Sequence, residues 1–340
     1  MITTDPASNV DLRYAKIEGI DLPVSRIAFG CMSTVGSQTY PGLAEQQAID
    51  TIRAAYDHGI NFFDTARAYA DGESEELLGK AIKDIRDKVV IASKPKPGDN
   101  SASEIVEECE HSLRSLGIDC IDLYQIHWPR RQTPMEETAA AMEKLIQQGK
   151  VKTIGVCNFG PQDLTEWLGF ASCVTDQIAF NMLMRAGEFE VQPLCVEREV
   201  GILCYSPLAQ GLLAGVYDQA DDVPSGKART RHFRGDRPEA RHGEDGCEDL
   251  TFEAVYKIKS IAQRIDRPMG EVAISWLLHQ PAITSVLVGA SRPDQIARNV
   301  SAFDLELNDE LLSELSAATD PVKQALGASI DMWSSPPRTR

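Results

Sequence analysis

Residues 44–69 read AEQQAIDTIRAAYDHGINFFDTARAY, and within them one spacing of apolar residues gives way to another. In the first half the apolar residues fall on one face of an amphipathic helix: Ala48, Ile49, Ile52 and Tyr56. Gly59 follows, and glycine commonly ends a helix. Residues 60–63 are then a short apolar run of the kind found in buried strands. The segment predicts a helix over residues 44–58 that leads directly into a strand.

The same alternation of helix and strand patterns continues along most of the chain. Further helices are expected at residues 74–83, 101–116, 133–149 and from residue 161 onward. Further strands are expected at residues 27–29, 89–92, 121–126, 152–156, 175–178, 201–204 and 284–288. Alternating strands and helices favour a parallel sheet, because parallel neighbours need crossover connections. Eight such units favour an α/β fold of the (β/α)₈ TIM-barrel type over an open sheet.

Several local signals refine this picture. Residues 101–104 (SASE) and 133–136 (TPME) match helix capping boxes, and in the second Pro134 is expected at the first helical position. Residues 13–26 are expected to form an N-terminal β-hairpin that closes the bottom of the barrel. The charged, Gly- and Pro-containing residues 218–249 predict a long loop after the seventh strand, either a functional lid or a disordered segment.

A C-terminal tail without periodicity is expected from residue 327. We interpret residues 1–340 as a single domain with a core at about residues 12–320.

Composition narrows the class of protein. A net charge of −17 disfavours nucleic acid and anionic membrane surfaces as partners. The 8 cysteines form no C-x-x-C pair, which favours reduced thiols over a disulfide framework. We expect a cytoplasmic protein, because no signal peptide and no apolar run of membrane-spanning length is visible. No zinc or iron motif is present, and no G-x-G-x-x-G fingerprint of a Rossmann fold.

In a TIM barrel the reactive groups lie at the C-terminal ends of the strands. The polar residues that follow or end the apolar runs are Asp64, Lys94, His127, Asn158, Gln177 and Tyr205. Tyr69 comes five residues after Asp64, in the same loop. We therefore expect these side chains, which lie far apart in sequence, to converge on one mouth of the barrel.

Four of these residues suit proton transfer. A free tyrosine has a pKa of about 10, too high for easy proton exchange near neutrality. A neighbouring Lys94 ammonium is expected to lower the pKa of Tyr69, and Asp64 to hold Lys94 charged and in position. His127 is expected to polarise a carbonyl oxygen. Such a group suits general-acid assistance to hydride transfer, in which an oxygen gains negative charge.

Five motifs now carry a specific resemblance. They are NFFDTARAY (residues 61–69, continuing through Gly72, Ser74-Glu75 and Leu78-Gly79), DLYQIHWP (122–129), IGVCNF (154–159), YSPL (205–208) and VGAS (288–291), the last followed by Gln295 and Asn299. In this order they resemble the aldo-keto reductase family, and specifically bacterial members related to the branch of the potassium-channel β subunits. The resemblance covers about residues 12–320.

The resemblance implies roles for the matched residues. Asp64, Tyr69, Lys94 and His127 fall on the catalytic tetrad. Asn158 and Gln177 fall on groups that hold the nicotinamide carboxamide, and Tyr205 on the aromatic residue that stacks against the nicotinamide. Ser206, Leu208, Gln210 and Gly211 fall on the pyrophosphate loop. Gly289, Ser291, Arg292, Gln295 and Asn299 fall near the adenosine 2′-phosphate and adenine.

The last group also has a physical rationale as a phosphate site. A helix that opens near Pro293 offers free N–H groups and a positive potential, to which Arg292 adds a charge. This favours NADP(H) over NAD(H) as the cofactor. The chain departs from the family at Cys157, where serine is frequent, and at Arg298, where glutamate is frequent.

The sequence therefore predicts an NADP(H)-dependent oxidoreductase that reduces an aldehyde or ketone, or oxidises the corresponding alcohol or sugar, with Tyr69 as general acid and base. One alternative is a cofactor-binding regulatory subunit of the channel β-subunit type. Another is an aldolase that forms a Schiff base on Lys94. The substrate, the direction of reaction and homo-oligomer formation stay open. Specificity is expected to lie in residues 32–37, Trp128, the 218–249 loop and the tail around Trp333.

Overall fold

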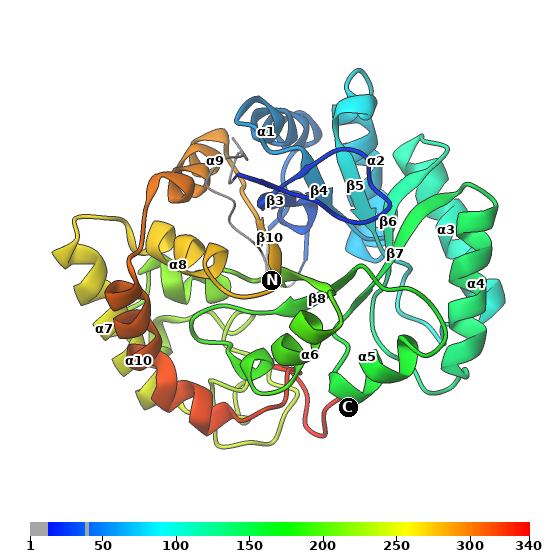
Figure 1. The fold of residues 1–340 in the computed structure, drawn as a ribbon. Coiled ribbons are helices and arrows are strands. Elements are labelled where there is room, and N and C mark those ends of the chain that lie inside the picture. The colour runs from blue at the N-terminus through cyan, green and yellow to red at the C-terminus, as the bar shows by residue number, and fades with distance from the viewer. Residues whose placement is uncertain (1–12, 38–40) are drawn as a thin grey trace.

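The computed structural model describes residues 13–37 and 41–340. Its centre is a closed barrel of parallel strands in the order β10-β3-β4-β5-β6-β7-β8-β9 (Figure 1). The barrel strands are β3 (Ile27–Gly30), β4 (Phe62–Asp64), β5 (Val90–Ser93), β6 (Ile121–Ile126), β7 (Val151–Cys157), β8 (Thr175–Ala179), β9 (Gly201–Tyr205) and β10 (Ile283–Val288). Each expected strand is present, so the predicted (β/α)₈ barrel is confirmed.

Helices surround the strands on the outside of the barrel (Figure 1). They are α1 (Glu45–Asp57), α2 (Glu73–Ile82), α3 (Ala102–Leu116), α4 (Met135–Gln147), α5 (Pro161–Trp167), α6 (Val191–Glu197), α7 (Glu248–Arg264), α8 (Met269–Leu278), α9 (Pro293–Val300) and α10 (Asp309–Leu326). The helix predicted from residues 44–58 is α1, which confirms the opening pattern to within one residue at each end. Crossover helices of this kind allow neighbouring strands to run parallel.

Of the two predicted capping boxes, one is present in part and the other is absent. At α3 the Ser101 hydroxyl accepts a hydrogen bond from the Glu104 backbone N–H (3.4 Å), but the Glu104 carboxylate accepts from the Asn100 N–H instead of closing the box on Ser101. At α4 the prediction is wrong, because Pro134 itself occupies the N-cap position and no side chain caps the helix. Its extended ψ of 134° places it one residue before the helix instead of at the first helical position.

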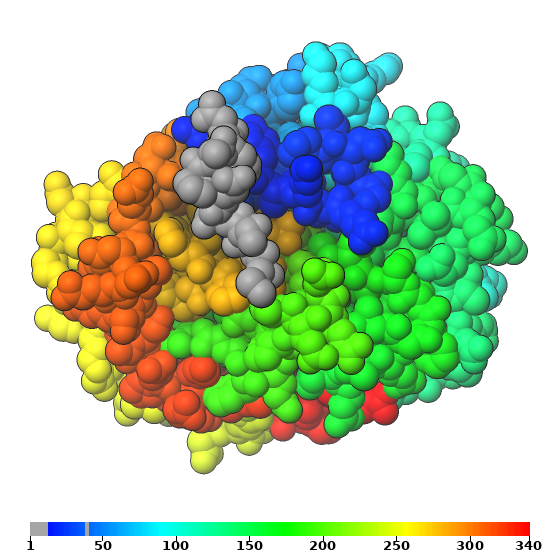
Figure 2. Space-filling view, in the orientation of Figure 1, coloured from blue at the N-terminus to red at the C-terminus, as the bar shows by residue number. Residues whose placement is uncertain are grey.

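The predicted N-terminal hairpin is confirmed. Strands β1 (Tyr14–Ala15) and β2 (Val24–Ser25) pair antiparallel, and Gly19 takes a φ of 78° in the turn between them. The hairpin side chains Ile17, Ile20 and Val24 pack with the inward residues of the barrel: Ala28, Phe62, Val90, Ala92, Leu123, Leu203 and Leu287. Figure 2 shows this dark-blue segment on the face toward the viewer. The hairpin therefore seals one end of the barrel and leaves the other end for a site.

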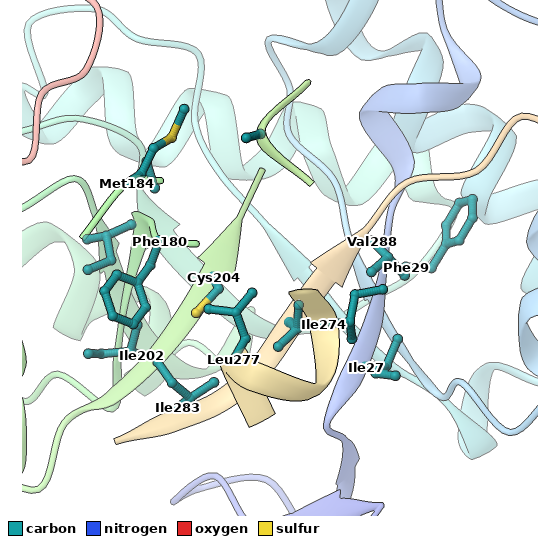
Figure 3. Close-up of a cluster of buried hydrophobic side chains, with 14 of the residues drawn as sticks. Ile27, Phe29, Phe180, Met184, Ile202, Cys204, Ile274, Leu277, Ile283 and Val288 are labelled. Carbon is teal, nitrogen blue, oxygen red and sulfur yellow. The ribbon is translucent and has the colours of Figure 1, made fainter. Parts of the chain in front are cut away.

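A second, larger apolar core lies between the strands and the helices. Figure 3 shows part of it, where Ile274 and Leu277 of α8 lie among side chains of β9 and β10 such as Ile202, Cys204 and Ile283. These side chains are at most 4% exposed. The strands are thus fixed from both faces, and the residues at their carboxyl ends have rigid supports.

The segment after β9 and the C-terminal tail pack against each other. The predicted long loop at residues 218–249 is present up to residue 247, with only a short 3₁₀ turn at Ala220–Asp222 before α7 begins at Glu248. The tail after α10 has no helix or strand, also as predicted. Arg231 of the loop donates to the carbonyls of Leu326, at the end of α10, and Met332 of the tail, and Arg241 bridges to Ser334. Figure 1 shows the red tail running from α10 toward α5.

Three further observations concern disulfide bonds, membrane-spanning helices and metal sites. All 8 cysteines lie in the described part of the chain, and each is free, as expected. Among residues 13–37 and 41–340, no helix has the length and apolar character needed to cross a membrane. In the same residues, no group of three or more His, Cys, Asp or Glu side chains is arranged to hold a metal ion.

Candidate active site

The carboxyl ends of the strands surround a cavity of about 360 Å³. Residues predicted from the strand-end rule or from the motifs line it: Asp64, Tyr69, His127, Asn158, Gln177, Tyr205, Ser206, Gln210 and Gly289. Lys94 lies against this group and is itself only 1% exposed. The structure therefore brings together side chains from β4 through β9 that are separated by more than a hundred residues in sequence.

Lys94 is a buried ammonium whose three N–H donors all have acceptors. It donates to Asp64 Oδ1 at 2.6 Å, to the Thr65 carbonyl at 2.9 Å and to the Tyr69 hydroxyl oxygen at 3.5 Å. Asp64 accepts on its other oxygen from the Gln177 amide at 2.7 Å. Burial is the largest single effect and disfavours the charged form, but the Asp64 carboxylate acts together with Tyr69 and Cys157 in the opposite direction, so the pKa of Lys94 is raised overall. The site holds one fixed positive charge beside a phenol.

Tyr69 lies against this charge on one side and an imidazole on the other. The Lys94 Nζ lies 5.2 Å from the centre of its ring, and the His127 ring meets it edge-on with centroids 6.1 Å apart. Burial raises the pKa of Tyr69 to about 12, although the Lys94 charge acts to lower it. The expectation of a lowered pKa is therefore wrong in its net direction. The opposing effect of Lys94 has the predicted sign, but desolvation is larger.

His127 is held as a neutral imidazole. Its Nδ1 lies 3.3 Å from the Pro95 carbonyl oxygen, and because that oxygen can only accept, we assign the ring proton to Nδ1. Burial lowers the pKa of His127 to about 3, and the positive charges of Lys94 and Arg130 act in the same direction. Nε2 is then an acceptor. This arrangement departs from the expectation that His127 polarises a carbonyl oxygen, which requires a donor.

Asn158 and Tyr205 form the opposite wall. Asn158 follows β7 with a left-handed φ of 60°, a conformation that asparagine tolerates better than most residues. Its amide donates to the His127 carbonyl at 3.1 Å, and its Oδ1 accepts from the Tyr205 hydroxyl at 2.7 Å. The Tyr205 ring stacks on Trp333 of the tail, with centroids 5.7 Å apart and planes inclined by 22°. The tail is thus part of the site wall.

A second cavity of about 720 Å³ adjoins the first and shares Ser33, Ser206, Pro207, Gln210 and Gly289 with it. The predicted cofactor residues that line it are Ser206, Leu208, Gln210, Gly211, Gly289, Ser291, Gln295 and Asn299. The two cavities together make an elongated groove from the strand ends to the start of α9.

The loop after β9 has an unusual backbone. Ser206, Ala209, Gln210 and Gly211 all have positive φ, between 45° and 107°. Such strained loops persist where the surrounding structure fixes them, and they cluster at ligand sites. The Oε1 atom of Gln210 is buried and has no hydrogen-bond partner among residues 13–37 and 41–340. At Gly289 a Cβ atom would lie 2.9 Å from that of Ser33, so a larger residue at this position would require Ser33 to shift. These features leave room and an unused acceptor for a ligand in the groove.

The basic residues of the second cavity differ from the expected one. Arg292 is not among the lining residues, and its Nε donates to Asp294 at 2.9 Å. Arg298 and Lys227 line the cavity instead, and Arg298 also contacts Asp294. Arg292 is the N-cap of α9 and bonds to Asp294 in the first turn, whereas Arg298 lies near the end of the helix and lines the groove.

Other residues that line the first cavity come from segments in which neither the strand-end pattern nor a motif could identify them. Arg229, Glu239 and Arg241 of the 218–249 loop, and Ser334 and Arg338 of the tail, line the first cavity. They follow no strand and belong to no motif. The sequence marks both segments, the charged 218–249 loop and the tail around Trp333, as places where specificity is expected, but it does not single out these residues.

Relatives of known name cover most of this chain. An aldo-keto reductase of Bacillus subtilis is 33% identical over 310 residues, which are 88% of this chain and 91% of that protein. The NADH-specific methylglyoxal reductase of Escherichia coli is also 33% identical, over 88% of this chain and 97% of its own length. A probable voltage-gated potassium channel subunit beta of Arabidopsis thaliana is 31% identical, over 86% and 92%.

Solved structures share the fold. A glycerol dehydrogenase from Gluconobacter oxydans superposes with a TM-score of 0.79 at 30% identity, over 92% of this chain and 95% of its own. An aldo/keto reductase from Klebsiella pneumoniae, solved in complex with NADP and acetate, superposes with a TM-score of 0.73 at 27% identity, over 94% and 99%.

The sequence profile of the aldo/keto reductase family matches residues 26–320, which span β3 to α10 and every strand of the barrel. The match therefore includes all the strand ends that build the first cavity and the loop that builds the second. On this evidence the chain belongs to the aldo/keto reductase family.

Proposed function

We propose that this single-domain oxidoreductase reduces an aldehyde or ketone with NADP(H), or oxidises the corresponding alcohol or sugar, by direct hydride transfer with Tyr69 as general acid and base. The observation that carries the proposal is the buried Lys94 ammonium, which contacts Asp64, Thr65 and Tyr69 with its three N–H groups. A charge so placed, held by Asp64 and Thr65, can stabilise a phenolate at residue 69.

The proposed proton path runs through Tyr69. When hydride reaches the carbonyl carbon, the C=O π electrons move to oxygen, and that oxygen takes the phenolic proton. The phenolate that remains lies 3.5 Å from the Lys94 ammonium, which stabilises it until solvent returns a proton. Asp64 keeps Lys94 charged and oriented, with Gln177 holding the far oxygen of the carboxylate. In alcohol oxidation the same phenolate accepts the proton.

A nicotinamide cofactor supplies the hydride when bound. The residues present fit such a group: the groove is long enough to join the strand ends to α9, and Gln210 offers a buried acceptor without a partner. Asn158 and Gln177 would hold the carboxamide, and Tyr205 would lie against the ring. Ser206, Leu208 and Gly211 would surround the pyrophosphate with their backbone, and Gly289, Ser291, Gln295 and Asn299 the adenosine end.

The proposal favours NADP(H) over NAD(H) because Arg298 and Lys227 line the second cavity. The Klebsiella relative was solved with NADP, which supports the same choice. The Escherichia coli relative is named NADH-specific, so the preference has to be measured on this chain. Arg292 stays a candidate for the 2′-phosphate only if it leaves Asp294.

His127 has a role that follows from its tautomer. With the proton on Nδ1, Nε2 accepts a hydrogen bond from a hydroxyl group. We propose that it orients a second hydroxyl group of the substrate, beside the reacting carbon, because the reacting hydroxyl of an alcohol donates its one proton to Tyr69. Because its pKa is about 3, His127 keeps this role throughout the neutral range.

The test is steady turnover of a panel of aldehydes, ketones and polyols with NADPH, NADH and their oxidised forms. The proposal expects many turnovers per active site with at least one carbonyl compound and a higher kcat/KM with NADPH. Oxidation of one equivalent of bound cofactor without further turnover would instead support the alternative of a regulatory subunit. That alternative is considered because the chain is 31% identical to a probable channel β subunit.

The Schiff-base alternative is disfavoured by the state of Lys94. A nucleophilic amine must be neutral, but the Asp64 carboxylate raises the pKa of Lys94. All three of its N–H groups are also occupied by protein acceptors. Attack on a carbonyl would require the loss of the ion pair, so borohydride is expected to trap no lysine–carbonyl adduct.

A further inference from the structure

Two arginines from irregular segments meet at the mouth of the first cavity. Arg241 belongs to the 218–249 loop and Arg338 to the tail, and the bridge between Arg241 and Ser334 joins the two segments. Both line the same cavity as Tyr69 and His127. Neither follows a barrel strand, so the framework of the barrel does not require a charge at either position.

Arg338 is held rigidly with part of its guanidinium unused. Its Nε and Nη2 donate to the two carboxylate oxygens of Asp331 at 2.8 and 2.7 Å, and Asp331 is fully buried. The guanidinium lies 3.6 Å from the centre of the Trp128 ring. Nη1 has no hydrogen-bond partner among residues 13–37 and 41–340. A guanidinium fixed by stacking and a bidentate pair loses little entropy when its remaining N–H groups bind a ligand.

Arg241 carries a charge that the protein does not neutralise. Its side chain is exposed and forms no hydrogen bond or ion pair within the described residues. Arg229 also lines this cavity, whereas the acids in the described lining are Glu239 and Asp64, and Asp64 is paired with Lys94. In a chain with a net charge of −17, three arginines at the mouth of one cavity need a specific explanation, even though Arg338 is paired with Asp331.

The cofactor's phosphates do not provide that explanation. The basic residues of the second cavity, where the proposed pyrophosphate and 2′-phosphate lie, are Lys227 and Arg298. Arg241 and Arg338 line only the first cavity, and Lys227 and Arg298 line only the second. The two pairs of cations therefore serve different parts of the groove, and the pair at the first cavity lies on the substrate side.

We propose that the carbonyl substrate of this enzyme carries an anionic group, a carboxylate or a phosphate, which Arg241 and Arg338 bind while the carbonyl oxygen lies at Tyr69. The proposal rests on the proposed function and adds the class of substrate. A cavity of about 360 Å³ lies near the lower end for ligand sites, so the anion is small. Charge-assisted contacts to two guanidinium groups would fix its distance from the reacting carbon.

The experiment compares matched substrates under saturating NADPH. Succinic semialdehyde is paired with butanal, which has the same carbon chain without the carboxylate, and glyceraldehyde 3-phosphate is paired with glyceraldehyde. We expect kcat/KM to be at least about tenfold higher for the charged member of one pair. Added salt should lower that advantage and leave the neutral member almost unchanged. The pair that responds identifies carboxylate or phosphate.

Three variants separate the subsite from general effects. Arg241→Gln changes an exposed side chain that has no hydrogen bond or ion pair in the described part of the chain. It should lower kcat/KM about tenfold or more for the charged member, with a much smaller change for the neutral one. Arg338→Gln should do the same, with the loss of its contact to Asp331 as an added effect. Arg234→Gln is the matched control, because Arg234 lies in the same loop but lines neither cavity. It should leave both rates unchanged.

Equal kcat/KM for both members of both pairs overturns the inference and leaves the proposed function standing, because the neutral aldehydes are still reduced. An equal loss for both members in Arg241→Gln, or the same loss in Arg234→Gln, also overturns it. A rise in KM for NADPH in Arg241→Gln would assign the residue to the cofactor instead. No turnover of any of the four compounds would overturn the inference, whereas the proposed function fails only if the whole panel of aldehydes, ketones and polyols gives no turnover.

Discussion

Replacing Lys94 by methionine removes the buried ammonium beside Tyr69 and keeps an unbranched side chain of similar length. Nζ lies 3.5 Å from the Tyr69 oxygen. At an effective dielectric constant of about 20, the attraction between an ammonium and a phenolate at that distance is about 5 kcal/mol, taken as an upper bound. Since one pKa unit corresponds to about 1.4 kcal/mol, the pKa of Tyr69 should rise by up to about three units.

The two directions of the reaction should respond differently. Alcohol oxidation needs the phenolate, so its rate near neutral pH should fall by up to about 10³-fold. Carbonyl reduction builds the phenolate only partly in the transition state. If half of the interaction is expressed there, about 2.5 kcal/mol, kcat for reduction should fall about 70-fold. The assay is NADPH oxidation and NADP⁺ reduction with the best substrate pair from the panel.

Folding has to be controlled, because Lys94→Met leaves the Asp64 carboxylate buried without its charged partner. Breaking such a pair costs about 3 to 5 kcal/mol of stability. The double variant Lys94→Met/Asp64→Asn removes both charges and should recover most of that stability without recovering activity. Thermal unfolding followed by circular dichroism measures the first quantity. A folded Lys94→Met protein with more than about a third of wild-type kcat in both directions would refute the assigned role of Lys94.

Three further predictions follow from the site. Burial raises the pKa of Tyr69 to about 12 and lowers that of His127 to about 3, so the rate of reduction should be almost independent of pH from about 6 to 9. The rate of oxidation should rise with pH, because the fraction of Tyr69 present as phenolate grows. A plateau in the oxidation rate that starts below about pH 7 would contradict this. Arg298→Ala should raise the KM for NADPH at least about fivefold without a comparable change in the KM for NADH. Arg292→Ala should raise the KM for NADPH less, because Arg292 is bonded to Asp294. Equal changes in KM for both nucleotides would count against recognition of the 2′-phosphate. Trp333→Ala removes the ring stacked on Tyr205 and should raise the substrate KM about two- to tenfold with less effect on kcat, while an unchanged KM would remove the tail from the substrate wall.

The barrel and the positions of the strand-end residues could be predicted from the sequence because local patterns determine them. Apolar periodicity places each strand and helix, and parallel strands then bring Asp64, His127 and Asn158 to one rim without further information. The hairpin could be predicted for the same reason, since its turn lies at Gly19 between two short extended segments. The start of α4 shows the limit of such local rules. The TPME pattern predicted a capping box that starts at Thr133, but Pro134 occupies the N-cap position in the structure.

What the sequence could not supply depends on contacts between distant segments. The net pKa of Tyr69 depends on how deeply neighbouring elements bury it, and the tautomer of His127 on the carbonyl of Pro95. The choice between Arg292 and Arg298 depends on which turn of α9 faces the groove. Arg241 and Arg338 meet only because the loop and the tail fold over the same mouth, and neither segment has a periodicity from which that could be read.

The central claim is that Tyr69 gives up its proton as hydride arrives, beside the charge of Lys94. Single-turnover reduction by Tyr69→Phe, with the enzyme saturated with NADPH, measures that step apart from product release. The account predicts a rate at least about 10²-fold below wild type with the NADPH dissociation constant almost unchanged. A Tyr69→Phe rate within a few-fold of wild type would contradict it.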